Sequence, residues 1–155
     1  MQRNFDLEDF MPYRLYQAME RTSQNFRDLY KKHYGLTRTE WRVMLNVGQY
    51  GPIEAGEISK RSFLHKTKIS RAVNSLEKKR WLERVHVEGD RRRQTLRLTP
   101  LGKQNFDKLA NLAMKYNEKL IESIGVEAFQ KLNTLLFQIE DSPTIDVGVD
   151  TGFDQ

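Results

Sequence analysis

The sequence predicts a mainly α-helical protein of the α+β class, with one small antiparallel β-hairpin. Three observations support this fold class. Apolar residues recur at three- and four-residue steps over most of the chain, which is typical of amphipathic helices. The spacing changes to an alternation of apolar and polar residues over residues 81–87 and 94–98, as in half-buried strands. Between these two segments lie Gly89 and Asp90, two residue types that favour a tight turn.

The N-terminal part of the chain predicts two helices. The first is expected over residues 9–33 and stops near Gly35, and its apolar stripe consists of Leu15, Met19, Thr22, Phe26 and Leu29. The second begins after Thr37. Thr37 and Glu40 have the spacing of a capping box, in which each side chain accepts a hydrogen bond from the other residue's backbone N–H.

The middle of the chain predicts two short helices over residues 55–62 and 66–79, after a break at Gly51 and Pro52. Residues 63–65 connect them tightly. Two short helices joined in this way form the helix-turn-helix pattern. The hairpin that follows is then the wing of a winged helix-turn-helix core.

The C-terminal part predicts two more helices and a tail. Thr99 as a cap and Pro100 at the first helical position begin one helix, and a last helix follows after Gly125. We expect residues 1–140 to form a single domain. The tail over residues 141–155 has four Asp and no Lys or Arg, and we expect it to be disordered.

Positive charge is concentrated in the middle of the chain. Residues 60–97 contain 13 Lys and Arg against 4 Asp and Glu, whereas the remaining residues contain 13 against 17. A basic segment between mildly acidic flanks favours a polyanionic partner such as nucleic acid. The alternative is an ordinary solvated charged face.

Several classes of function lack the residues that they need. The chain has no Cys, which excludes disulfides, thiolate metal sites and thiol-based redox sensing. It has no long apolar run and no apolar signal segment at its start, so we expect a cytoplasmic protein. His33, His65 and His86 lack metal-ligand spacing, and no nucleophile–base pair stands out. We therefore expect no metal, no cofactor and no enzymatic activity.

The helix over residues 66–79 has two contrasting faces. Ile69, Ala72, Val73 and Leu76 form its apolar face. The opposite face carries Thr67, Arg71, Asn74 and Lys78, and Lys68 and Ser70 flank it; Lys66, at the start of the helix, completes the predicted site. Arg can bind guanine and Asn can bind adenine through two hydrogen bonds each, while Lys, Ser and Thr can hold phosphates. This helix is therefore the predicted base reader, and the alternative is an ordinary surface helix.

The predicted hairpin carries Arg91, Arg92 and Arg93 next to its turn. Three adjacent arginines repel one another unless an anion neutralises them, and a narrow minor groove offers such a negative potential. We expect Asp90 to brace one of the arginines through a charge-assisted hydrogen bond. The alternative is a solvated charged turn.

The run from residue 36 to residue 102 resembles the winged-helix core of the MarR family of bacterial transcriptional regulators. The motifs that support the resemblance are Leu36-Thr37…Glu40-Trp41, Gly51-Pro52-Ile53…Glu57-Ile58, Lys66-Thr67-Lys68-Ile69-Ser70-Arg71, Leu76-Glu77-Lys78-Lys79, Asp90-Arg91-Arg92 and Leu98-Thr99…Gly102. Three positions depart from the family pattern. Arg80 stands where a helix-ending Gly is usual, His65 stands where Asp often caps the helix, and Gly56 weakens the short preceding helix.

The resemblance implies a homodimer in which helices over residues 9–34 and 103–140 interlock and residues 36–102 bind a pseudo-palindromic operator in double-stranded DNA. The apolar stripes of the terminal helices also exceed what the core can cover, which favours a dimer over a monomer that folds back on itself. The resemblance further implies that a small, often phenolic or anionic, effector releases the DNA.

The sequence thus predicts a sequence-specific DNA-binding regulator, a homodimeric repressor relieved by a small aromatic or anionic effector. Candidate backbone-phosphate contacts are Thr37, Arg38 and Ser59, and candidate effector contacts are Arg14 and Trp41. The alternative is a winged-helix protein-interaction module that docks an acidic partner.

Overall fold

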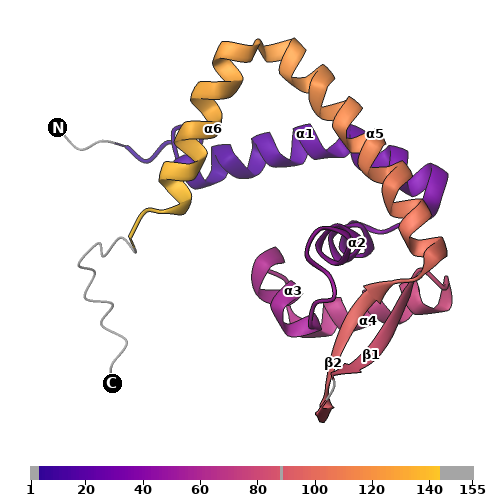
Figure 1. Ribbon diagram of the computed structural model, residues 1–155. Coiled ribbons are helices and arrows are strands. Elements are labelled where there is room, and N and C mark those ends of the chain that lie inside the picture. The colour runs from indigo at the N-terminus through magenta and orange to yellow at the C-terminus, as the bar shows by residue number, and fades with distance from the viewer. Residues whose placement is uncertain (1–3, 88, 144–155) are drawn as a thin grey trace, which may run out of the picture. The chain divides into compact units, whose positions relative to one another are not determined.

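A computed structural model describes residues 4–87 and 89–143 of the chain, and it describes Arg91 and Arg92 by their backbone alone. Within these residues the elements follow one another in the predicted order (Figure 1). They are α1 (Met11–Tyr34), α2 (Arg38–Tyr50), α3 (Ala55–Ser62), α4 (Lys66–Lys78), β1 (Leu82–Val87), β2 (Asp90–Leu98), α5 (Pro100–Ile124) and α6 (Val126–Glu140). The predicted fold class is confirmed. The chain divides into two compact units, Met1–Tyr116 and Asn117–Gln155, with the boundary inside α5.

The junction between α1 and α2 follows local rules. α1 ends at Gly35, which has a φ of 59° in the left-handed region and donates its N–H to the Lys31 carbonyl. Thr37 caps α2: its Oγ1 accepts from the Glu40 N–H at 3.2 Å, and Glu40 Oε2 accepts from the Thr37 N–H at 2.6 Å. The predicted capping box is therefore confirmed.

α2, α3 and α4 pack around one apolar centre (Figure 1). Its fully buried side chains from these helices are Val43, Met44, Ile58, Ile69, Val73 and Leu76. Phe63 forms the turn between α3 and α4 with a φ of 51°. His65 Nδ1 accepts a hydrogen bond from the Thr67 N–H at 3.3 Å. The start of α4 is therefore capped, although a ring nitrogen at this distance binds less tightly than the expected Asp carboxylate.

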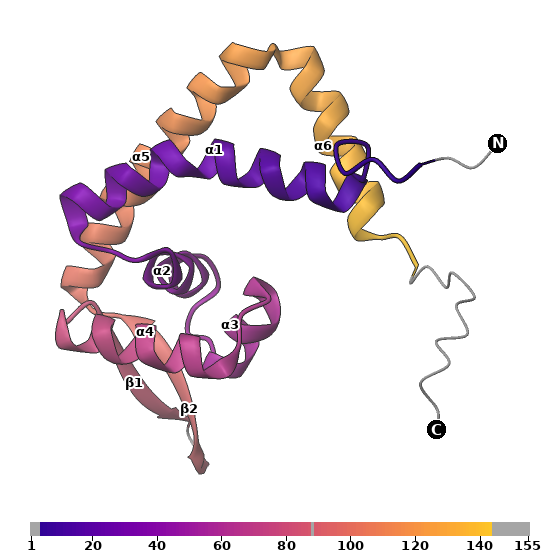
Figure 2. The same ribbon diagram turned by 180° about the vertical axis from the view of Figure 1, so that it is seen from behind.

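β1 and β2 form the antiparallel wing, which follows the end of α4 (Figure 2). β2 begins at Asp90, so the backbone of residues 91–93 belongs to the strand and not to the turn. This corrects the prediction that the second strand begins near residue 94. Side-chain alternation does not mark residues 91–93 as a strand, whereas strand pairing depends on backbone hydrogen bonds that charged residues also make.

Two contacts hold the wing against the helices. Ile53, in the connection between α2 and α3, pairs with Leu96 of β2 through backbone bonds of 3.1 and 2.8 Å. Arg80 has a φ of 60°, so it adopts the left-handed conformation that the usual Gly would adopt. Thr99 Oγ1 donates to the Arg80 carbonyl at 2.6 Å, which ties the start of α5 to this turn.

α5 and α6 continue the chain beyond the wing. Thr99 Oγ1 accepts from the Gly102 N–H at 3.0 Å, so Thr99 is the predicted cap of α5. Gly125, with a φ of 89°, separates α5 from α6 as expected. Large apolar side chains on α6 remain exposed, and α6 has no buried residue. Over the described part of the chain, no helix is both long and apolar enough to cross a membrane.

An aromatic cluster joins α1, α2 and the first part of α5. The Phe26 ring lies 5.3 Å from the rings of both Trp41 and Tyr116, and Tyr30 stacks on Trp41 at 5.7 Å. The Tyr116 hydroxyl also donates to the Thr22 carbonyl of α1. This cluster fixes α1 to the winged-helix core through apolar contact and aromatic packing.

Candidate nucleic-acid interface

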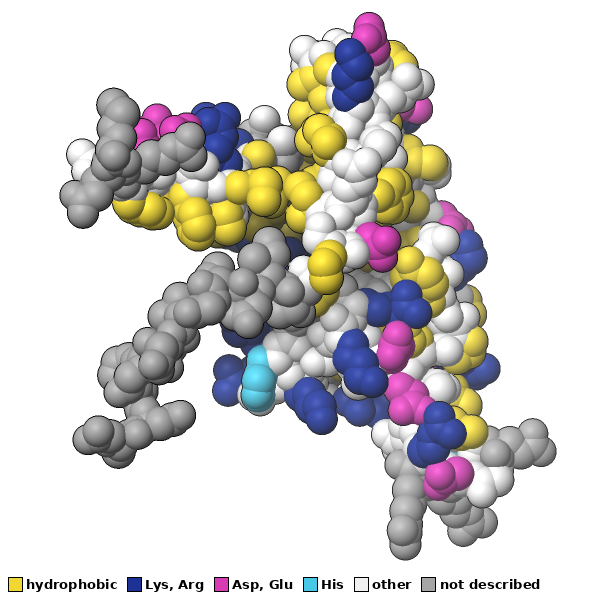
Figure 3. Space-filling view, turned by 90° about the vertical axis from the view of Figure 1, so that its left-hand side faces the viewer, with side chains coloured by type: hydrophobic (Ala, Val, Ile, Leu, Met, Phe, Trp, Pro, Cys, Tyr) yellow, Lys and Arg dark blue, Asp and Glu magenta, His cyan; other side chains and the backbone are white. Residues whose placement is uncertain are grey.

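The predicted reading helix, α4, has one buried face and one exposed face. Ile69, Val73 and Leu76 are at most 1% exposed. The seven polar residues of the predicted site on this helix are all exposed: Lys66, Thr67, Lys68, Ser70, Arg71, Asn74 and Lys78. Figure 3 shows Lys and Arg side chains gathered over the part of the first unit that carries α3, α4 and the wing. The outer face of α4 is therefore free to meet a polyanion.

Two hollows border the outer face of α4. One, of about 490 Å³, lies between the start of α2 and α4, and its lining includes Thr37, Lys68 and Arg71. The other, of about 340 Å³, lies between α3, α4 and β1, and its lining includes Ser70 and Arg84. Each hollow brings hydroxyl and cationic side chains together, as phosphate groups require.

Asn74 is already engaged within the protein. Arg84 of β1 donates from Nη2 to Asn74 Oδ1 at 2.9 Å. Arg84 Nε also lies 3.1 Å from Glu77 Oε1. Arg84 thus links the wing to α4, a role that the alternating pattern of residues 81–87 does not predict because it indicates only a strand. The sequence does contain a signal for this contact: Arg84 is a basic residue at an outward position of the strand that directly follows the reading helix.

The wing arginines divide into two groups. Arg93 pairs with Glu54, which precedes α3, and this hydrogen bond raises the pKa of the Arg93 guanidinium further. The charge of Asp90 acts on Arg93 in the same direction, but more weakly than that of Glu54. The side chains of Arg91 and Arg92, predicted to enter a minor groove, lie outside the described residues.

The three candidate phosphate contacts each have an internal partner. Thr37 belongs to the capping box of α2. The Ser59 hydroxyl donates to the Leu64 carbonyl, so its single donor is used. Arg38 makes a two-pronged contact with Glu20 of α1, at 2.5 and 2.9 Å. The Arg38 hydrogen bond lowers the pKa of Glu20, which keeps this pair charged.

Glu40 connects the capping box to α4. It is 4% exposed, and its Oε1 accepts from the Ser75 hydroxyl at 2.6 Å and lies 3.7 Å from Lys79 Nζ. Burial raises the pKa of Glu40, but the hydrogen bonds from Ser75 and Thr37 and the charge of Lys79 outweigh burial and lower the pKa overall. A buried carboxylate therefore joins the start of α2 to the reading helix.

The two candidate effector contacts do not share a hollow among those found in the described residues. Trp41 is 8% exposed and belongs to the aromatic cluster, so it is a core residue. Arg14 is exposed on α1 and lines a hollow of about 340 Å³ together with Tyr13, Gln17 and Arg21. Neighbouring side chains of a single helix provide most of this lining.

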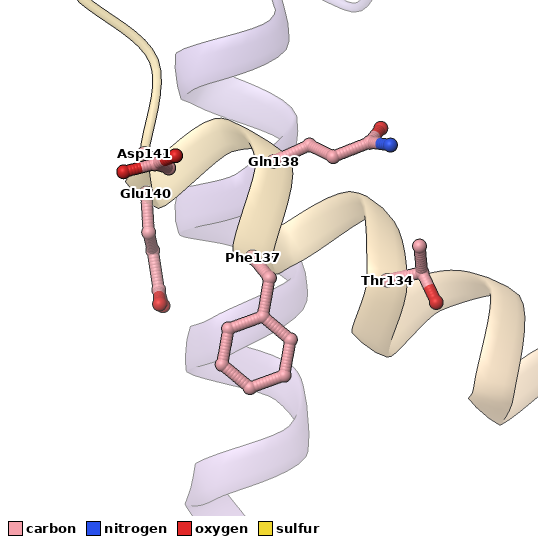
Figure 4. Close-up of a pocket in the computed structure, with 5 residues that line it drawn as sticks. All are labelled: Thr134, Phe137, Gln138, Glu140 and Asp141. Atoms are coloured by element: carbon pink, nitrogen blue, oxygen red, sulfur yellow. The ribbon is translucent and has the colours of Figure 1, made fainter.

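A further hollow lies on α6 (Figure 4). Its volume is about 630 Å³, and its described lining is Thr134, Phe137, Gln138, Glu140 and Asp141. Two of these five residues are acidic and none is basic, so the hollow does not suit an anion. Among the described residues, no group of three or more His, Cys, Asp or Glu could hold a metal ion.

The fold and the exposed basic face define a winged helix-turn-helix protein of the DNA-binding class. Residues 34–93 match the model of the MarR family. The chain is 25% identical over 132 residues to the HTH-type transcriptional repressor IacR of Pseudomonas putida, covering 85% of this chain and 78% of that protein.

Two solved structures extend this similarity over nearly the whole chain. The transcriptional regulator PA4135 is 25% identical with a TM-score of 0.76, over 85% of this chain and 97% of that one. BpsR of Bordetella bronchiseptica, whose DNA binding is regulated by 6-hydroxynicotinic acid, shares the fold with a TM-score of 0.78 at 16% identity, over 91% and 100%. The chain is a DNA-binding transcriptional regulator whose residues 34–93 resemble the MarR family.

Proposed function

We propose that the chain is a cytoplasmic homodimeric repressor without enzymatic activity. In this proposal α4 reads a pseudo-palindromic operator in duplex DNA, and a small aromatic or anionic effector releases the DNA. The observation that carries the proposal is the outer face of α4, where Lys66, Lys68, Arg71 and Lys78 are exposed. The apolar face of the same helix is buried, so α4 can present only this basic face to a partner.

Exposed apolar surface on the terminal helices supports the homodimer. On α6, Leu132 is 45% exposed, Leu135 54% and Phe137 62%. In the first unit, Phe10 and Met11 at the start of α1 are also about half exposed. A second copy of the chain would cover such surfaces, and a two-fold dimer matches two operator half-sites. Half-site centres are then expected about 34–36 Å apart.

The effector proposal rests on the regulation of BpsR by an aromatic acid and on the cations of α1. Arg14 and Arg21 line one hollow beside Tyr13 and Glu8. The two cations outnumber the single acid, and cations beside a tyrosine ring suit an aromatic carboxylate. Trp41 remains a candidate contact only if the aromatic cluster opens, because its ring is packed against Phe26.

Replacing Arg71 by Ala is expected to weaken operator binding by about 5- to 150-fold, the equivalent of about 1–3 kcal/mol for a lost two-pronged base contact. Base preference should relax at one position of each half-site. The measurement is a titration of labelled duplex by fluorescence anisotropy. Arg97→Ala is the matched control, because Arg97 is exposed on the wing and pairs with Glu83. Absence of duplex binding by the unaltered protein would instead favour the protein-interaction module.

Replacing Leu135 by Glu is expected to convert the dimer into monomers at micromolar concentration. A charge at the interface would be buried without a partner, whereas in a single chain Leu135 is exposed and a Glu there costs little. Light scattering after size-exclusion chromatography measures the mass. Asn133→Glu adds the same charge at a neighbouring exposed position and serves as the control. A monomeric unaltered protein would contradict the dimer.

A further inference from the structure

The outer face of α4 contains an amide whose orientation is fixed from the wing. Asn74 is exposed, and its Oδ1 accepts a hydrogen bond from Arg84 Nη2 at 2.9 Å. Arg84 Nε lies 3.1 and 3.2 Å from the two carboxylate oxygens of Glu77, one helical turn further along α4. Glu77 therefore holds the guanidinium of Arg84 where it meets the amide of Asn74.

Charge decides which end of the amide faces Arg84. A guanidinium has only N–H donors, so it donates to the amide oxygen and repels the amide nitrogen, which is also a donor. Rotating the amide by half a turn would exchange a charge-assisted hydrogen bond for a donor–donor contact. The two N–H donors of Asn74 Nδ2 are consequently left to face a partner of α4.

An amide held in this way cannot read adenine in the usual manner. The two-pronged adenine contact needs Oδ1 to accept from N6 and Nδ2 to donate to N7. Guanine presents two acceptors in the major groove, N7 and O6, whereas adenine presents an N6 donor where guanine has O6. The free donors of Asn74 therefore match guanine and meet a donor on adenine.

We propose that Asn74 is a specificity-determining residue that selects guanine over adenine, with Arg84 as the residue that positions it. This inference rests on the proposed function, because it requires α4 to enter the major groove. It reverses the preference that an unrestrained Asn on this helix would have. A wing residue thereby sets base preference through the reading helix.

The test is the selection of a randomised duplex library by the full chain, followed by sequencing of the bound fraction. The variants are Asn74→Ala, Arg84→Met and the double variant Asn74→Ala/Arg84→Met. Arg97→Met is the matched control, since Arg97 also pairs with a glutamate on the wing, Glu83, and its removal changes the charge equally. Thermal unfolding checks that each variant is folded.

At one position of each half-site, the unaltered protein should enrich guanine over adenine about tenfold. Asn74→Ala should remove the base preference at that same position. Arg84→Met frees Oδ1 and should shift the ratio toward adenine by a similar factor. The double variant should match Asn74→Ala, and Arg97→Met should keep the original profile. The Asn74→Ala comparison stays decisive even if Arg84→Met does not fold, because it changes an exposed side chain.

Three results would overturn the inference. The first is that the unaltered protein enriches adenine at the position that Asn74 contacts. The second is that Arg84→Met has the same base preferences as the unaltered protein. The third is that Asn74→Ala weakens binding to all sequences equally and changes the base preference at no position. In each of these cases DNA binding itself stands. If the unaltered protein enriches no sequence at all, the proposed function fails together with this inference.

Discussion

Replacing Glu40 by Ala is expected to lower the free energy of unfolding by about 3 kcal/mol, because it removes a buried charge that several donors share. The Ser75 hydroxyl and the Thr37 N–H, both 2.6 Å from the carboxylate, lose their acceptor, and Lys79 loses its nearby countercharge. The start of α2 and the middle of α4 would then no longer be joined. Urea unfolding at a fixed protein concentration measures the change.

Glu83→Ala is the control for this prediction. Glu83 pairs with Arg97 at 2.7 Å, but both side chains are about half exposed, so water replaces the lost contact. Removing such a surface pair is expected to change stability by less than about 1 kcal/mol. Equal effects of Glu40→Ala and Glu83→Ala would show that burial and shared donors at Glu40 contribute nothing.

The lowered pKa of Glu40 also predicts a pH dependence. A carboxyl group with a folded-state pKa below its ordinary value of 4.5 stabilises the fold at pH values above 4.5. That contribution is lost as the pH falls from 4.5 through the folded-state pKa, because the unfolded chain then takes up a proton that the folded protein does not. Between neutral pH and acid, the unaltered protein should therefore lose more stability than Glu40→Gln, which cannot titrate. Parallel pH profiles would contradict this assignment.

Local sequence rules predicted the features that depend on near neighbours in the chain. The capping box of Thr37 and Glu40 and the cap at Thr99 each involve residues three positions apart. The two faces of α4 follow from helical spacing alone. A helix is the backbone geometry that satisfies each of these residue spacings, so the sequence is enough to locate the helix starts and the buried face of α4.

Contacts between distant residues were not predictable in this way. Arg38 meets Glu20 across 18 positions, and Arg93 meets Glu54 across 39. Both arginines are predicted to face DNA, because neighbouring residues in the sequence do not reveal that each pairs with a distant glutamate. The Arg84–Asn74 bond depends in addition on how the wing leaves α4, which the left-handed Arg80 determines.

Replacing Gly102 by Ala is expected to destabilise the protein by about 3 kcal/mol, at the upper end for an overpacked site. A Cβ on Gly102 would lie 1.9 Å from the carbonyl oxygen and 3.0 Å from the Cα of Trp81, and both atoms belong to the backbone. The Trp81 carbonyl also accepts from the Thr99 N–H at 3.1 Å, which fixes the start of α5 at this distance. Either the backbone at Trp81, just before β1, or the start of α5 would have to move. Thermal and urea unfolding measure the loss.

Gly56→Ala separates steric conflict from a general effect of replacing glycine. Gly56 also lies in the first turn of a helix, α3, but a Cβ there would meet nothing within 4 Å. Alanine loses less backbone entropy on folding than glycine, so this variant is expected to gain about 0.5–1 kcal/mol. The two substitutions are identical in chemistry and should shift the unfolding midpoint in opposite directions. A loss at both positions would mean that the Trp81 contact is not the cause, and the Gly of the Leu98-Thr99…Gly102 motif would need another explanation.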